Sequence, residues 1–272
     1  MSRTLIISDL HMGHDGPSAV TAASLAPLLN TIDHLVVNGD VADLNHPRFQ
    51  DHALEQVAAL KAICQQEKLE LTLLTGNHDP MVSDHHMLAF GGGHLVVTHG
   101  HVTHPAIAPW WPIAPQLRRG FKATLIAMPS EVRDTASGRL EAARTSCAEA
   151  WAYVQPILRA RGSRPSRLNF LLKRPQAPLQ ILGFWMTYPS RCAAFARRYL
   201  PTCRLFVVGH SHRQGIWRRG SITIINTGAF RFPGKPRGVV IEGELVTVHR
   251  IDRRAQGWHL QPMPLQTWPV NT

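Results

Sequence analysis

Cysteine is scarce in this sequence. The four residues, Cys64, Cys147, Cys192 and Cys203, lie far apart, and no two form a Cys-x-x-Cys pair. Disulfide frameworks and structural zinc sites both use cysteines at characteristic close spacings, so neither is expected to hold this fold together. The four residues are interpreted as reduced thiols, which predicts a cytoplasmic protein.

Long apolar runs are absent as well. Residues 1–9 reach a charged side chain after only a few apolar ones, so no signal peptide is expected there. The longest uncharged stretch near the middle, residues 175–190, is broken by prolines and glutamines. It is also too short for a membrane span of roughly 20 residues. The expected location is the cytoplasm, either free or peripheral at a membrane surface.

Acidic residues are few in one part of the chain. Residues 103–204 hold 16 Lys and Arg against 4 Asp and Glu, whereas the remainder holds 13 against 14. The formal net charge of +11 therefore arises in the middle third. A basic segment attracts phosphate-bearing partners, here a phosphorylated substrate, an anionic membrane or a nucleic acid. A solvated basic face that only aids solubility is the alternative interpretation.

Strand-like and helix-like segments alternate in the first hundred residues. Apolar runs predict strands at 4–8, 35–37, 69–74 and 95–98. Apolar spacing predicts helices at 17–30 and 47–67. Alternation of this kind predicts an α/β fold with largely parallel strands.

The pattern changes near residue 103. Helices are predicted at about 140–158 and 189–200, with a short irregular one before them. Strands are predicted again at 205–208, 221–226, 238–241 and 245–251, with a hairpin turn at 242–244 between the last two. These closing strands are expected to form a second, mixed sheet packed on the first. The predicted division is a core of residues 1–102 and 203–254, a basic helical insertion at 103–202 and an extended tail at 255–272.

Polar side chains that can bind metals follow five of the predicted strands. They are Asp9 and His11; Asp40; Asn77, His78 and Asp79; His99 and His101; and His210 and His212. In parallel sheets, ligands collect beyond the carboxyl ends of the strands. Mixed oxygen and nitrogen donors suit Mn²⁺, Fe or Zn²⁺, and the donors outnumber the needs of one ion. Two divalent ions are therefore predicted, an arrangement that serves phosphoester hydrolysis.

Taken in order, the five clusters resemble the motifs of calcineurin-like metallophosphoesterases. The motifs are Asp9-x-His11, Gly39-Asp40, Gly76-Asn77-His78-Asp79, His99-Gly100-His101 and Gly209-His210-Ser211-His212. The resemblance covers about residues 1–102 and 203–250. It implies two packed mixed β-sheets flanked by helices, a four-layer αββα sandwich. It also implies hydrolysis of a phosphomonoester, phosphodiester or pyrophosphate bond by a metal-bridging water.

The resemblance also implies roles for single residues. Asp9, His11 and His212 would hold one ion, Asn77, His99 and His210 the other, and Asp40 would bridge them. His78 would act as general acid, with Asp79, where the family often has Glu, orienting its ring. Residues 226–228 resemble the turn that follows the last motif and would pack under the site. Asp43 is interpreted either as a support for the ligands or as a helix N-cap.

The insertion leaves and re-enters the core beside the motifs, which predicts a lid over the site. Its placement is similar to the lid of UDP-2,3-diacylglucosamine pyrophosphatases, which implies a nucleotide-linked lipid substrate. That branch usually has Arg where this chain has His78. A nucleic-acid or nucleotide phosphodiesterase is the alternative, since the same arginines would attract it. A non-catalytic scaffold is a third hypothesis, and such a protein would be expected to have lost some of the metal ligands.

Overall fold

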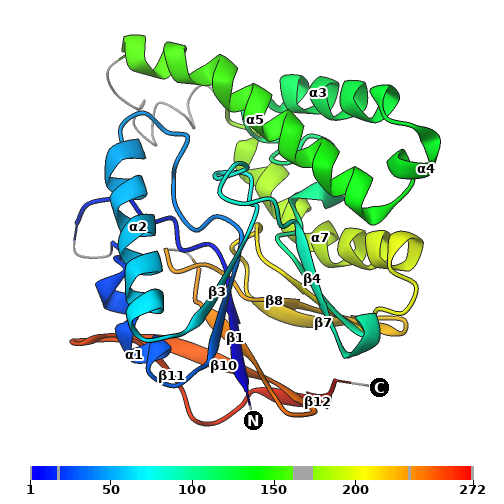
Figure 1. Cartoon of the computed structure of the whole chain (residues 1–272). Helices are drawn as coiled ribbons and strands as arrows, with labels where there is room; N and C mark the ends of the chain where they lie inside the picture. Colours follow the sequence, from blue (N-terminus) through cyan, green and yellow to red (C-terminus); the bar gives the residue numbers. More distant parts are fainter. Residues whose placement is uncertain (1, 17–18, 162–173, 232–233, 271–272) are drawn as a thin grey trace.

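Two β-sheets stack face to face between layers of helices (Figure 1). The computed structural model describes residues 2–16, 19–161, 174–231 and 234–270. Helices α1 and α2 lie on one side of the sheets, and α3, α5 and α7 lie on the other. Both sheets are mixed, so the predicted fold class, two mixed sheets flanked by helices, is confirmed.

The first sheet has seven strands, in the order β11-β10-β9-β1-β2-β3, with β12 paired to β10. The strands are β1 (Arg3–Ile7), β2 (His34–Asn38), β3 (Glu70–Leu74), β9 (Arg237–Glu242), β10 (Leu245–Arg254), β11 (Gly257–Leu260) and β12 (Gln266–Pro269). Strands β1, β2 and β3 are parallel. Their carboxyl ends therefore share one edge, and the loops that carry Asp9, Asp40 and Asn77 leave from it.

The second sheet has five strands, in the order β4-β5-β6-β8-β7. They are β4 (Met87–Phe90), β5 (Leu95–Thr98), β6 (Leu205–Val208), β7 (Gly215–Arg219) and β8 (Ile222–Asn226). Strands β5, β6 and β8 are parallel, so His99 and His210 follow strands that end at the same edge. Strands β4 and β7 are not among the strands predicted from the sequence.

The prediction that the closing strands form the second sheet is wrong for β9 and β10. Strand β9 pairs with β1 in antiparallel register, and β10 follows it through a tight hairpin at Gly243, as the turn signal predicts. Strand β1 would otherwise present an open edge of unpaired N–H and C=O groups, and β9 covers that edge. Only β6, β7 and β8 of the later strands join the second sheet.

Side-chain alternation along the strands builds three apolar layers. On β1, Leu5 and Ile7 face α1 and α2, whereas Ile6 points into the space between the sheets. On β6, Val207 points into that same space, whereas Phe206 faces the helices of the insertion. The fully buried strands thus read as continuous apolar runs because both faces are covered.

The predicted helix at 17–30 is mostly wrong. Within the described residues the segment forms a single turn of 3₁₀ helix, η1 (Ala23–Leu25), and a short helix α1 (Ala26–Leu29). Pro27 lies in the first turn of α1, where its missing backbone N–H cannot continue the hydrogen bonds of η1. Residues 17–18 lie outside the described residues. The second predicted helix is present as α2 (Gln50–Gln66).

The insertion is helical, as predicted. Its described helices are α3 (Ala114–Ala127), α4 (Ser130–Arg133), α5 (Ala136–Arg161) and α7 (Ala177–Tyr199). Helix α7 begins well before the predicted residue 189 and continues through Pro189. Proline leaves the carbonyl four residues earlier without its helical partner. That carbonyl belongs to Trp185, and it accepts a hydrogen bond from the Arg213 guanidinium at 3.2 Å instead.

Helix α7 also forms the outer layer of the second sheet. Phe184, Tyr188 and Cys192 are buried against Phe206 and Ile224 of β6 and β8. The insertion therefore does more than cover a site: it supplies the fourth layer of the sandwich. Without it, the outer face of the second sheet would expose these apolar side chains to water.

The C-terminal tail belongs to the first sheet. The sequence predicts an extended surface segment beyond residue 254, but β11 and β12 both pair with β10 through antiparallel hydrogen bonds. The tail lies extended because it continues a β-ladder, and Trp258 on β11 is buried in the core. Within the described residues, no helix is long and apolar enough to cross a membrane.

Candidate metal centre

Most of the predicted ligands lie in unusual backbone conformations. Asp9, His11, Asp40, His210 and His212 all have φ between 47° and 65°. Side-chain-bearing residues rarely adopt this left-handed region, and each costs free energy unless the surroundings enforce it. Such conformations gather at functional sites because they turn several side chains of a short loop toward one point.

Close contact between the motif loops explains two of the motif glycines. A Cβ atom at Gly76 would collide with the backbone nitrogen and carboxylate of Asp40, and one at Gly209 would collide with the carboxylate of Asp9. Strands from different parts of the chain thus bring their loops into direct contact at the sheet edge. Only glycine permits this approach.

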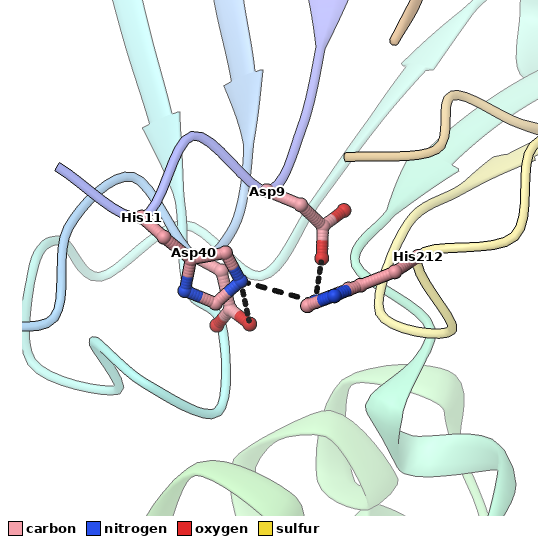
Figure 2. A group of neighbouring side chains, drawn as sticks. All are labelled: Asp9, His11, Asp40 and His212. Carbon is pink, nitrogen blue, oxygen red and sulfur yellow. Dashed lines mark hydrogen bonds and ion pairs between the residues drawn. The ribbon is translucent and has the colours of Figure 1, made fainter. Parts of the chain in front are cut away.

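Four of the predicted ligands converge in one cluster (Figure 2). Asp9, His11, Asp40 and His212 each offer a donor atom within 4.8 Å of the others. The Nε2 atoms of His11 and His212 lie 3.0 Å apart, and His212 Nε2 lies 3.3 Å from Asp9 Oδ1. The cluster mixes nitrogen and oxygen donors in the manner of a divalent metal site.

The remaining three predicted ligands meet beside this cluster. The side-chain oxygen of Asn77 lies 3.2 Å from His99 Nε2 and 2.7 Å from His210 Nδ1. His99 Nε2 is also 3.3 Å from Asp40 Oδ2. Asp40 therefore borders both sets, as a bridging carboxylate would. The structure brings all seven predicted ligands together.

The hydrogen bonds around Asn77, His99 and His210 favour a cation between these three side chains. His99 Nδ1 donates to the Asn38 carbonyl at 2.8 Å, and His210 Nε2 donates to the Ile107 carbonyl at 3.1 Å. In a neutral imidazole the other nitrogen then carries a lone pair. For both residues that nitrogen faces the oxygen of Asn77, another acceptor. Acceptors at these distances repel one another unless a cation lies between them, so the residues fit a metal ion.

The imidazole of His11, in the first cluster, is also held in a single tautomer. His11 Nδ1 contacts the carboxylate of Asp43 at 3.0 Å, which fixes the proton on that nitrogen. His11 Nε2 then presents a lone pair toward His212 Nε2 and Asp40. Carboxylates and backbone carbonyls thus hold three of the imidazoles in the tautomer that metal binding requires.

Charges in the site perturb the titration of its members. Burial raises the pKa of Asp40, but His99 and His78 outweigh burial and hold that pKa well below its usual value. Burial lowers the pKa of His99, whereas Asp40 and Asp9 raise it to about 10. In the metal-free protein a proton on His99 therefore balances the buried carboxylates. Burial and the neighbouring His99 lower the pKa of His210 to about 3, so this ring is neutral.

His78 lies next to the first cluster, and its partner is Asp43. Its Nδ1 contacts Asp43 Oδ1 at 2.8 Å, and its ring meets that of His11 edge-on with centroids 4.8 Å apart. Burial lowers the pKa of His78, but Asp40 and Asp43 together raise it to about 9. The prediction that Asp79 orients this ring is therefore wrong: Asp43 makes that contact.

Asp79 instead supports the backbone of the motif loops. Its buried carboxylate accepts hydrogen bonds from the N–H groups of Gly76, Asp40 and Val41. Burial and the charge of Asp40 raise the pKa of Asp79 to about 7. The residue holds the loop that carries Asn77 against the loop that carries Asp40.

Asp43 is the residue whose role the sequence left open. Its carboxylate contacts the imidazoles of His11, His14 and His78. It does not cap a helix, because α2 begins at Gln50 and Phe49 occupies the N-cap position. Its position in the sequence indicates that it lies near the site, because Asp43 follows Asp40 by three residues on the same loop. The spacing alone does not show which imidazole lies opposite.

Two further groups support the centre from below. Asn226 donates to the Gly209 carbonyl at 2.7 Å, and Thr227 shares a hydrogen bond with Ser8, which in turn donates to Asp9. These contacts agree with the expected position of residues 226–228 beneath the site. His101 is buried, with neither ring nitrogen hydrogen-bonded among the residues that the structure describes, and its ring centroid lies 5.4 Å from that of His99.

A pocket of about 270 Å³ opens above the metal centre. Its floor is formed by ligands and by His78, and its walls come from the insertion. The wall residues include four tryptophans, Trp110, Trp111, Trp151 and Trp185, together with Ile107, Ile113, Leu117 and Ile181. No lysine or arginine is among the residues that line it, within the part of the chain described. The basic residues on the described helices of the insertion therefore lie outside the pocket.

Two of these tryptophans tie the insertion to the ligand loops. The indole N–H of Trp151 on α5 donates to the Asn77 carbonyl at 2.8 Å. The indole N–H of Trp185 on α7 donates to the Ser211 carbonyl, also at 2.8 Å. Each helix thus contacts the backbone of a different ligand motif. Neither contact is predicted from the sequence.

Stacked mixed sheets with aspartate, asparagine and histidine donors at their common edge define an α/β sandwich protein with a candidate metal centre at that edge. The family model described as calcineurin-like phosphoesterase matches residues 2–214, and the chain belongs to this family. A search of curated protein sequences finds no match.

Several solved structures are similar to this chain. Vps29 from Entamoeba histolytica complexed with Zn²⁺ shares 13% identity, covering 97% of this chain and 99% of its own, with a TM-score of 0.45. A dimetal phosphatase from Danio rerio shares 10% identity over 91% of this chain and 95% of its own, with a TM-score of 0.44. A cold-active protein-tyrosine phosphatase of a Shewanella species shares 14% identity over 96% and 80%, with a TM-score of 0.38.

Proposed function

We propose that this protein is a dinuclear metal-dependent phosphoesterase that hydrolyses a phosphomonoester, phosphodiester or pyrophosphate bond. The observation that carries the proposal is the convergence of two sets of donor atoms on Asp40, at the floor of a pocket that also contains His78. Divalent cations held there, with Mn²⁺, Fe or Zn²⁺ suited to the donors, would polarise a phosphoryl oxygen and lower the pKa of the attacking water.

His78 is the proton donor in this proposal. Asp43 engages its Nδ1, so Nε2 is the nitrogen available to protonate the leaving oxygen. The pKa of about 9 in the metal-free protein keeps the imidazole protonated near neutral pH. Asp43 acts through His78: it orients the ring and stabilises its charge.

The pocket walls bear on the substrate. Indole and aliphatic side chains bind an apolar group and exclude water from the reacting phosphate. An apolar substituent close to the scissile phosphate therefore fits this pocket. A nucleotide-linked lipid has such a substituent, and we take it as the substrate class. A cytoplasmic site of action belongs to the same proposal, since the four cysteines are free and buried.

A nucleotide or nucleic-acid phosphodiesterase is the second candidate. Trp111 and Trp151 lie 5.3 Å apart between ring centroids and both line the pocket, and a base could stack on either face. The two candidates differ in what fills the walls, an alkyl chain or an aromatic base. A non-catalytic scaffold would bind metal and partner without turnover.

The proposal is tested by measuring metal content and turnover together. The purified protein is expected to bind two equivalents of Mn²⁺ or Zn²⁺ and to hydrolyse members of a panel of aryl monoesters, aryl diesters, nucleotide-diphosphate lipids and oligonucleotides. Asp40→Asn is expected to lower kcat/KM by more than about a hundredfold. Mutation of a residue that only supports a metal ligand typically lowers metal affinity or activity about 10–100-fold, so loss of a direct ligand should cost more.

The matched control is Glu244→Gln, which removes an exposed carboxylate in the β9–β10 turn, at the sheet end opposite the ligand loops. It should retain both metal and turnover. Metal-loaded wild type that turns over no member of the panel would favour the scaffold hypothesis. Unchanged turnover in Asp40→Asn would refute the proposed centre.

A further inference from the structure

Helix α7 presents different chemistry on its two sides. Its inner side buries Phe184 and Tyr188 against the second sheet. Its outer side carries Leu179, Leu182 and Met186, whose exposed fractions are 73%, 51% and 67%. Spacings of three and four residues place these three side chains on one stripe along the helix.

Exposure of three long apolar side chains on one helix is unfavourable in water. Each would gain about 1.5–3 kcal/mol on full burial. Single exposed apolar residues need no explanation, but a stripe of them marks a surface that something else covers. The stripe is confined to the first half of α7.

Positive charge surrounds the stripe. Helix α7 contains no aspartate or glutamate, and Arg197 continues the same side of the helix toward its end. Arg219 of β7 reaches the helix at Ser190, with its Nε 3.3 Å from the hydroxyl. Arg213 reaches it at Trp185. Within the described residues, none of these three guanidinium groups forms an ion pair with a carboxylate.

The stripe also borders the pocket. Ile181 and Trp185, which line the pocket, are the sequence neighbours of Leu182 and Met186 on α7. Apolar surface therefore continues from the pocket wall onto the outside of the molecule along a single helix. A substrate with a long apolar chain could leave the pocket along this path.

We propose that α7 docks on the surface of an anionic lipid bilayer, with Leu179, Leu182 and Met186 in the interface and the neighbouring arginines at the lipid phosphates. An apolar stripe flanked by arginines is the pattern of a helix that lies in the plane of a membrane interface. Charge complementarity favours an anionic bilayer over a protein partner, since none of the three arginines beside the stripe forms an ion pair with a carboxylate within the described residues. The inference rests on the proposed function in one respect: a docked α7 would bring the pocket to a lipid-linked substrate.

Co-sedimentation with vesicles tests the docking surface. Protein without added metal is mixed at low salt with vesicles of phosphatidylcholine alone or of phosphatidylcholine with phosphatidylglycerol. We expect sedimentation with the anionic vesicles only, weakening as salt rises. The double variant Leu182→Glu/Met186→Glu should bind at least about tenfold more weakly, because it loses two buried apolar side chains.

The control is Met263→Glu, at an exposed residue in the C-terminal tail with a 78% exposed side chain. It should bind like the wild type, and circular dichroism and hydrolysis of a soluble aryl phosphodiester should be unchanged in both variants. Wild type that stays in solution with anionic vesicles, or equal binding by wild type and double variant, would overturn the docking surface. Because vesicle binding is measured without metal or turnover, its failure is separate from failure of the proposed enzyme.

Discussion

Single carboxylates determine the chemistry of the imidazoles in this site. Asp43 contacts His78 and His11, so one buried charge both orients the proposed acid and fixes the tautomer of a ligand. Burial raises the pKa of Asp43, but His78 and His11 outweigh burial and hold it well below its usual value. The carboxylate is therefore ionised throughout the working pH range, and its effect on His78 persists when cations screen Asp40.

Removal of this charge should change the pH dependence of turnover. A general acid works in its protonated form, so activity falls as pH rises through its pKa. Asp43 raises the pKa of His78, and Asp43→Asn should therefore move the alkaline limb of kcat to lower pH by about one unit or more. The control is Asp84→Asn, whose carboxylate is 98% exposed and pairs with Arg144 at the surface. The measurement is kcat over pH 6–10, a range of about four units that includes the pKa of His78. An alkaline limb at the same pH in Asp43→Asn and in the wild type would contradict the assigned role.

At the scale of elements, two helices of the insertion are fastened to the metal loops. The indole N–H groups of Trp151 and Trp185 each satisfy a backbone carbonyl of a ligand motif, on Asn77 and Ser211. The same rings form pocket walls. The pocket walls on α5 and α7 are thus hydrogen-bonded directly to the loops that carry the candidate ligands.

Loss of one such hydrogen bond should weaken metal binding. Trp185→Phe keeps an aromatic ring but leaves the Ser211 carbonyl without its donor, so His210 and His212 on the same loop lose support. We expect Mn²⁺ or Zn²⁺ affinity, measured by titration calorimetry, to fall by about tenfold. Trp258→Phe is the control, because within the described residues that buried indole N–H has no hydrogen-bond partner, and the ring lies in the core beside α1 and α2. Equal affinities in all three proteins would show that the contact is dispensable.

At the scale of the whole molecule, the metal centre joins the two sheets. Asp9, Asp40 and Asn77 follow strands of the first sheet, whereas His99 and His210 follow strands of the second. The sheets otherwise meet through apolar side chains, which resist separation but do not fix their relative position sharply. Ions shared across the edge would hold the sheets in register.

Metal removal should therefore lower thermal stability. Metal at about 100 times its Kd stabilises the folded state by about 2.7 kcal/mol. For a domain of this size the melting temperature should fall by about 5–10 °C after treatment with a chelator. Differential scanning calorimetry would measure it, and added Mn²⁺ or Zn²⁺ should restore it. Asp40→Asn should show a smaller metal response, and a melting temperature indifferent to metal in the wild type would contradict shared ligation.

Much of the fold and of the centre follows from local sequence. Buried strands appear as apolar runs because both faces of each sheet are covered, and Asp9, Asp40, Asn77, His99 and His210 follow those runs directly. Parallel strands then bring their ends to one edge, which is why spacing alone indicated a common site. The helix predicted at 17–30 is present only from Ala23 to Leu29, because an apolar spacing does not by itself show where a helix begins.

Contacts between distant residues were decided only by the tertiary structure. The sequence determined which residues could bind metal, because side-chain chemistry and strand ends are local properties. It could not determine that Asp43 rather than Asp79 meets His78, since that depends on how two loops approach. Nor could it show that β9 returns to β1, or that α7 forms a layer of the sandwich as well as a pocket wall. Those outcomes depend on which apolar faces and open strand edges remain to be covered once the rest of the chain has packed.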